Sequence, residues 1–219
     1  MLRLMALVVP IAIGDSLNPS TIAPALYLAS GERARKSVAA FTAAVLLVHL
    51  AGGAAIALGP GQLVLSLLNQ LGQRIGDILA IAAGAAMTMV AGVMWYKRRR
   101  LAQKELPSPN PKGRSSALLG ATIIAVELPT AFPYFAAIAL IIGSRQPTAS
   151  QALPLVLYNT CFVLPLIAIL LTLMLAGDEA DTRLTRARAS LQRRWPSVVA
   201  LLLLLVGVSF AALGAGALI

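Results

Sequence analysis

Long apolar runs separated by short polar segments make up most of this chain. Six runs approach or exceed the roughly 20 residues that a helix needs to cross a bilayer. Between the second and third runs, Leu and Val alternate with polar side chains at helical spacing over residues 62–77, which predicts a helix along the membrane surface. The pattern predicts an all-α integral membrane protein. Its six transmembrane helices are expected at residues 4–29, 37–58, 78–96, 117–142, 152–176 and 196–219.

Two of these predicted spans are interrupted near their middles by prolines and polar residues. A carboxylate or a freed backbone group inside a membrane costs free energy unless it finds a partner, and this cost favours a functional site. The alternative is a proline-kinked structural helix whose Asp15 bonds a neighbouring helix. The first interruption is Gly14-Asp15-Ser16-Leu17-Asn18-Pro19-Ser20-Thr21 followed by Pro24, and the second is Glu127-Leu128-Pro129-Thr130 followed by Pro133. Helix breaks are expected at the prolines of these segments, Pro19, Pro24, Pro129 and Pro133, and at Pro165 in the fifth span.

A polar, proline-rich linker at 101–116 divides the chain into two halves, 1–100 and 117–219, with three predicted spans each. Because three is odd, the second half enters the membrane from the opposite side, and homologous halves would form an inverted repeat. The interruptions support homology, since Asn18 precedes Pro24 and Glu127 precedes Pro133 by the same six residues. We therefore predict a single membrane domain, 1–219, built from two inverted three-helix repeats with broken helices 1 and 4.

Small residues recur every four positions in the third and sixth predicted spans. Such stripes allow helix backbones to approach closely, within one chain or between two copies of it. The stripes are Ala80, Gly84, Thr88 and Gly92 in one span, and Gly207, Ala211 and Ala215 in the other.

The charge distribution indicates membrane orientation. The chain is 58% hydrophobic and only 12% charged, against about 25% charged in soluble domains. All Lys and Arg except Arg3, Arg74 and Arg145 fall in 31–36, 97–114 and 183–194. Basic loops stay on the cytoplasmic side, so the net charge of +10 reflects topology and not nucleic-acid binding. The protein is expected in the inner (cytoplasmic) membrane as a multi-pass protein, with an uncleaved N-terminus and both termini outside.

The polar residues of the interruptions are the candidate substrate-binding or proton-binding site. If both breaks lie at mid-membrane, the pseudo-twofold axis brings them together, and burial there favours the protonated form of a carboxylate. His49, near the middle of the second span, can exchange a proton with these acids or make a structural hydrogen bond. In the fifth span, Asn159 can face the substrate path or bond carbonyls freed by Pro165. The remaining candidates are Asp15, Asn18, Ser20, Thr21, Glu127 and Thr130.

Enzyme chemistry is not expected. One His and one Cys cannot supply a metal cluster or a Cys/His pair with its orienting group, and no phosphate-binding glycine loop is present. A single Cys, Cys161, also excludes a disulfide within the chain. We therefore predict no catalytic residues, no metal site and no cofactor.

Three motifs carry a family resemblance that extends over essentially the whole chain. The segment 14–21, the segment 127–130, and Tyr158-Asn159-Thr160-Cys161-Phe162-Val163-Leu164-Pro165 together resemble the GAP family, also called the sulfolipid-1-addressing family, of the lysine-exporter superfamily. The resemblance implies a membrane protein that assists export or surface delivery of cell-envelope glycolipids. Thiol-disulfide carriers of that superfamily have a cysteine beside each proline, where this chain has Ser20 and Thr130, so their redox activity is not implied here.

We interpret the chain as a membrane transporter that assists export of cell-envelope glycolipids, with proton coupling as part of the hypothesis. One alternative is an exporter of a small solute such as an amino acid or metal cation, because buried acids and amides also suit a cation. A second alternative is a non-transporting membrane partner of a lipid-export machine. The expected partners are membrane lipids, lipid-export machinery and, through the small-residue stripes, a second copy of the chain.

Overall fold

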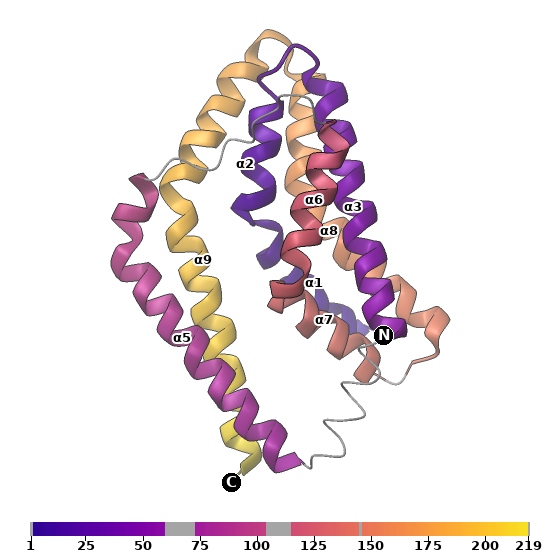
Figure 1. The fold of residues 1–219 in the computed structure, drawn as a ribbon, viewed down its shortest axis with the longest axis vertical. Coiled ribbons are helices and arrows are strands. Elements are labelled where there is room, and N and C mark those ends of the chain that lie inside the picture. The colour runs from indigo at the N-terminus through magenta and orange to yellow at the C-terminus, as the bar shows by residue number, and fades with distance from the viewer. Residues whose placement is uncertain (1, 60–72, 104–114, 145, 219) are drawn as a thin grey trace. The chain divides into compact units, whose positions relative to one another are not determined.

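The computed structural model describes residues 2–59, 73–103, 115–144 and 146–218. Within these ranges all regular structure is helical, which confirms the predicted all-α class (Figure 1). The predicted surface helix and the linker lie largely outside the described residues. The helices are α1 Leu2–Ser16, α2 Pro19–Leu28, α3 Ala34–Leu58, α5 Gln73–Gln103, α6 Ser116–Glu127, α7 Phe132–Gly143, α8 Thr148–Leu175 and α9 Ala180–Leu218, with short 3-10 turns η1 Leu128–Thr130 and η2 Gly177–Glu179.

Three described helices are long and apolar enough to cross a membrane, and two bent helix pairs raise the number to five. The single helices are α3, Ala149–Leu175 in α8 and Thr182–Ser209 in α9. The bent pairs are α1 with α2, at 53°, and α6 with α7, at 74°. The two bends occur at the two interruptions expected from the sequence. The predicted span 78–96 lies inside the continuous helix α5.

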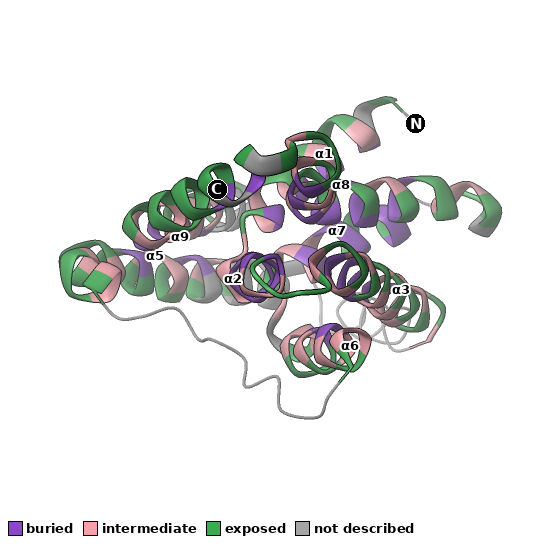
Figure 2. Ribbon diagram, turned by 90° about the horizontal axis from the view of Figure 1, so that it is seen from above, coloured by how far each residue is buried: buried purple, intermediate pink, exposed green. Residues whose placement is uncertain are grey.

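The chain forms two compact units. Unit 1 consists of Met1–Gln62 and Leu106–Ser190, and unit 2 consists of Leu63–Glu105 and Leu191–Ile219. In unit 1, α3 packs against α6 and α8, and α1 packs against α7 and α8. Buried residues gather on α2, α3, α7 and α8 (Figure 2). Unit 1 therefore contains both bends and the core that surrounds them.

The bends have local causes. Asn18 adopts an extended backbone at the N-cap of α2, and its Oδ1 accepts a hydrogen bond from the Ser20 N–H at 3.1 Å. Pro19 occupies the first turn, where a missing N–H has no helical cost. At the second bend, η1 contains Pro129, and Ala131 leaves the helical region with φ −77° and ψ 66° before α7 begins.

Pro24 and Pro165 do not interrupt their helices, in contrast to the sequence-based expectation. Pro24 lies inside α2. Helix α8 continues through Pro165 and also through Pro154. Membrane helices tolerate internal proline because neighbouring groups re-satisfy the freed backbone. The prolines that lie at the helix interruptions are Pro19 at the first bend and two prolines at the second bend. Of these two, Pro129 lies in η1 and Pro133 lies in the first turn of α7.

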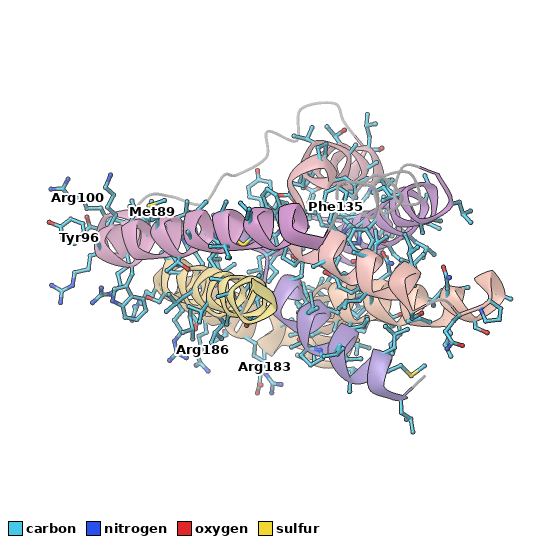
Figure 3. The ribbon with its side chains drawn as sticks, turned by 90° about the horizontal axis from the view of Figure 1, so that it is seen from below. Met89, Tyr96, Arg100, Phe135, Arg183 and Arg186 are labelled. Carbon is cyan, nitrogen blue, oxygen red and sulfur yellow. The ribbon has the colours of Figure 1, made fainter. Side chains whose placement is uncertain are left out.

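The basic segment 183–194, expected as a loop, is helical, because α9 runs without interruption from Ala180 through Pro196 to Leu218. Its composition of Arg, Ala, Leu and Gln has high helix propensity, and charge alone gave no information on local structure. Arg183 forms an exposed ion pair of 2.7 Å with Glu179. The side chains of Arg183 and Arg186 extend away from the ribbon, as do Tyr96 and Arg100 at the end of α5 (Figure 3).

In unit 2, α5 and α9 approach closely at the small-residue stripes. A Cβ added at Gly84 would lie 2.5 Å from the carbonyl oxygen of Gly207 and 2.6 Å from the amide nitrogen of Ala211. A Cβ at Gly207 would lie 2.8 Å from the Thr88 hydroxyl. No side chain larger than hydrogen fits at either glycine without backbone movement, so Gly84 and Gly207 let α5 and α9 pack closely. Gly92 of the first stripe has no neighbour within 4 Å at its Cβ position.

Candidate functional site

The two interruptions meet through a hydrogen bond between residues far apart in the chain. Asn18 Nδ2 donates to Glu127 Oε2 at 3.3 Å, across 109 residues of sequence. The other end of the same amide, Oδ1, accepts from the backbone and the hydroxyl of Ser20, at 3.1 Å and 2.6 Å. Asn18 therefore caps α2 and at the same time joins the first interruption to the second.

Asp15 lies in the last turn of α1 and also has a partner from a distant helix. The Tyr158 hydroxyl, from α8, donates to Asp15 Oδ2 at 2.8 Å. Tyr158 is fully buried, so its hydroxyl needs this acceptor. The bond holds one carboxylate oxygen of Asp15 and connects α1 to α8 at the level of the bend.

His49 is buried in unit 1 between two aromatic rings. Its ring stacks on Tyr134 at 3.9 Å between centroids and on Phe162 at 4.3 Å, with interplanar angles of 16° and 10°. Tyr134 reaches this position because α3 has glycine at residue 53, where a Cβ would overlap the Tyr134 hydroxyl. The imidazole is only 2% exposed and is held in one plane.

Asn159 orients His49. The Asn159 Nδ2 group donates to the Leu155 carbonyl at 2.7 Å and to the Tyr134 hydroxyl at 3.0 Å, which leaves Oδ1 to face His49 Nδ1 at 2.8 Å. Since Oδ1 can only accept, Nδ1 carries the hydrogen. The Tyr134 hydroxyl donates in turn to the His49 carbonyl at 2.9 Å. Neutral His49 therefore has its lone pair on Nε2, the nitrogen that this network leaves available.

A cavity of about 150 Å³, the central cavity, lies where these groups converge. Asp15, Asn18, His49 and Glu127 supply its polar wall, and Phe162 is among the apolar residues that complete it. Two carboxylates and an imidazole give the cavity several proton-accepting atoms. Elsewhere in proteins, pockets for drug-sized ligands occupy about 300–1,000 Å³, so this space suits a proton, a few water molecules or a small cation.

The other predicted site residues serve the local structure of the bends. Thr21 is buried, and its hydroxyl donates to the Asn18 carbonyl at 3.0 Å. Ser20 completes the cap of α2 and lies within reach of the Glu127 carboxylate. Thr130 ends η1, and its side chain is outside the described part of the structure. Within the described residues, no three His, Cys, Asp or Glu side chains gather closely enough to coordinate a metal ion.

Tyr134, Tyr158 and Phe162 belong to the site but were not among the predicted site residues. The sequence contains a weak signal for two of them, because Tyr134 follows Pro133 directly and Tyr158 precedes Asn159. An aromatic residue in an apolar span is ordinary, so position alone did not separate these rings from the core. A buried tyrosine hydroxyl beside a polar break is the feature that could have identified them.

These features define a class: a multi-pass helical membrane protein with two broken helices whose interruptions enclose a small polar cavity. The model of one family, described as "Sap, sulfolipid-1-addressing protein", matches residues 8–216, and the chain belongs to this family. No curated protein and no solved structure matches the chain.

Proposed function

We propose that this protein is an inner-membrane transporter that assists the export of cell-envelope glycolipids, with the central cavity as the site that couples transport to a proton. The family name links the proposal to lipid delivery. The observation that carries it is the Asn18–Glu127 hydrogen bond, because it joins two interrupted helices around a cavity inside the apolar part of the protein. Membrane proteins place such breaks at transport sites, where cavity-lining backbone is tolerated.

We propose further that the chain contains six spans arranged as two inverted repeats, as in the lysine-exporter superfamily. The packing in unit 1 supports this arrangement. If α1, α2 and α3 correspond to α6, α7 and α8, the α3–α6 contact corresponds to α8–α1, and the α2–α8 contact corresponds to α7–α3. Each of these contacts is present. In this arrangement both termini lie outside, and α5 and α9 supply the third span of each repeat.

The cavity is a coupling site in this proposal and not a lipid-binding site. Its volume of about 150 Å³ is too small for a sugar head group with its acyl chains. Asp15 and Glu127 can each hold or release a proton. The Nε2 atom of His49 can accept a proton from one group and pass it to another. The lipid would move along the protein surface with its acyl chains in the bilayer. No covalent step is involved, so the proposal requires no enzymatic activity and no cofactor.

The small volume also favours a second candidate, an exporter of a small solute or cation. In that case the carboxylates bind the solute directly, and Asn18 supplies a polar ligand. The first candidate exports a glycolipid and the second exports a small solute or cation, so one export experiment can distinguish them.

The experiment replaces each carboxylate in the full-length protein and measures export. A strain lacking the gene receives the wild type, Asp15→Asn or Glu127→Gln, and mass spectrometry measures the fraction of glycolipid that a brief solvent wash removes from intact cells. Loss of a charged hydrogen-bonding group costs about 1.5–3 kcal/mol, so export should fall about tenfold or more in either variant. Collapse of the proton gradient should reduce wild-type export in the same way.

Glu179→Gln is the matched control, because it makes the same chemical change at an exposed carboxylate of an i,i+4 ion pair. It should retain wild-type export.

Normal glycolipid export in Asp15→Asn and Glu127→Gln would reject the coupling site. Retention of an amino acid or a metal ion inside these cells, with normal surface glycolipid, would identify the small-solute exporter. Export that requires the protein in cells, with no lipid movement by the purified protein in vesicles, would identify a non-transporting partner.

A further inference from the structure

A second cavity, of about 470 Å³, lies in unit 1 where the connection from α2 enters α3 and where α8 ends. Its wall contains three basic side chains, Arg33, Arg35 and Lys36, one acidic side chain, Glu32, and apolar surface from Leu173 and Ala180. It shares no lining residue with the central cavity. This second space, the surface cavity, therefore requires its own explanation.

Arg35 is fixed at the wall of the surface cavity. Its Nε donates to the Leu173 carbonyl oxygen at 3.0 Å, in the last turn of α8, where carbonyls lack helical partners. Within the described residues the two Nη nitrogens of Arg35 make no hydrogen bond, so the outer part of the guanidinium is available to a ligand. This fork of N–H donors matches two oxygens of a phosphate or sulfate group.

The charges around the surface cavity favour an anion. Three positive groups and one negative group give a net charge of +2, and no ion pair links them within the described part of the chain. The residue at the N-cap of α3 is Arg33, which makes no side-chain capping hydrogen bond there. The positive end of the helix dipole of α3 therefore adds to the charge of the basic side chains.

The position of the surface cavity indicates where the anion comes from. α3 begins and α8 ends beside it, and both helices are long and apolar enough to cross a membrane. Their ends mark the level of the lipid head groups. Leu173 and Ala180 are buried and lie beside the charged groups, so the wall is apolar on one side and basic on the other. The volume lies within the range of about 300–1,000 Å³ that is usual for ligand sites.

We propose that the surface cavity binds the phosphate or sulfate head group of an anionic membrane lipid. The Arg35 fork holds the oxyanion, Arg33 and Lys36 add positive charge, and Leu173 with Ala180 contacts the first carbons of the lipid. The site is independent of the central cavity, and its failure would leave the proposed coupling site untouched.

The test measures lipid binding to the full-length protein in nanodiscs. Nanodiscs of phosphatidylcholine receive increasing fractions of phosphatidylglycerol, and native mass spectrometry records the share of protein that retains one phosphatidylglycerol. Arg35→Gln removes the fork and should raise the half-saturating lipid fraction about fivefold or more. Arg99→Gln, the same change at an exposed arginine of α5 outside the cavity wall, should shift it by less than about twofold.

A third variant tests the proposal independently, in case Arg35→Gln fails to fold. Ala180→Met keeps every charge, fills part of the surface cavity and should weaken binding in the same direction. Equal effects of Arg35→Gln and Arg99→Gln, or wild-type binding by Ala180→Met, would overturn the proposal. The last measurement adds inorganic phosphate or inorganic sulfate as a competitor of the lipid. Weak competition by either ion supports a lipid ligand, whereas displacement of the lipid at equal concentration would assign the site to the free anion.

Discussion

His49 is held by contacts that fix both its plane and its hydrogen position. Tyr134 and Phe162 cover its two faces, and Asn159 accepts the hydrogen of Nδ1. Asn159 is itself fully buried and uses both ends of its amide. The orientation of the imidazole toward the central cavity therefore depends on one side chain in α8 that does not line the cavity.

Replacement of Asn159 tests this dependence. Asn159→Leu leaves the His49 Nδ1–H and the Tyr134 hydroxyl short of a buried partner, which should lower the free energy of unfolding by about 1–3 kcal/mol. Thermal unfolding of the detergent-solubilised protein measures the change. Thr160→Val is the control, because the exposed Thr160 hydroxyl bonds only the Val156 carbonyl in its own helix. A similar melting temperature for Asn159→Leu and Thr160→Val would show that the network contributes nothing to stability.

At the scale of elements, the first bend depends on a residue with two separate tasks. Asn18 Oδ1 caps α2, whereas Asn18 Nδ2 bonds Glu127. A serine at this position can still cap a helix but cannot reach Glu127 with an amide. The helix-capping task and the task of joining the bends can therefore be separated by substitution.

Two substitutions of Asn18 should have different effects. Asn18→Ala removes the cap and should destabilise the protein by about 1 kcal/mol, whereas Asn18→Ser should keep most of the stability. Both should impair export, since both lose the bond to Glu127. Thermal unfolding and the glycolipid-export measurement, made on the same two variants, provide the check. Wild-type export by Asn18→Ser would mean that the hydrogen bond between the bends is not required.

The bends are also the part of the structure that the sequence predicted best. Polar side chains close to a proline are costly inside a membrane span, so they indicated the interruptions. The first interruption has Asp15 and Asn18 close to Pro19, and the second has Glu127 close to Pro129. The partners of these side chains could not be predicted, because they depend on how each helix is rotated about its axis. Tyr158 is one such partner, since its hydroxyl reaches Asp15 across 143 residues.

Charge and proline alone do not determine local structure in this chain. Residues 183–194 were expected as a loop because they are basic, yet basic residues form helices readily. Pro24 and Pro165 were expected to interrupt helices, yet both lie inside them. A proline interrupts a helix here only where capping or backbone geometry also changes, as at Asn18 and Ala131.

At the scale of the whole molecule, the chain alternates between two compact units in a regular way. The first two predicted spans of each half belong to unit 1, and the third span of each half belongs to unit 2. Each half therefore contributes to both units in the same order. This order is what two repeats of one ancestral segment would produce, and an inverted arrangement fixes which connections lie on which side of the membrane.

Membrane topology can be tested with single cysteines. In a Cys161→Ser background, Ser30→Cys lies in the connection from α2 to α3, which we expect inside, and Gln146→Cys precedes α8, which we expect outside. Both positions are exposed. A membrane-impermeant maleimide added to intact spheroplasts should label Gln146→Cys at once and Ser30→Cys only after permeabilisation. Labelling of both from the same side would exclude the inverted repeat.

The stacking of His49 between two rings restricts how an imidazole can carry protons. A half-turn of the ring would need the aromatic side chains of Tyr134 and Phe162 to separate, because they lie 3.9 Å and 4.3 Å from it. Without that ring flip, Nδ1 and Nε2 cannot exchange places. Loss of the Nδ1 hydrogen is also blocked, because its partner, the Asn159 amide oxygen, accepts a hydrogen bond but is too weak a base to remove the proton. A hydrogen ion taken up at Nε2 must therefore depart from the same nitrogen, so its release on the opposite side of the bilayer would follow only from a rearrangement of the surrounding helices.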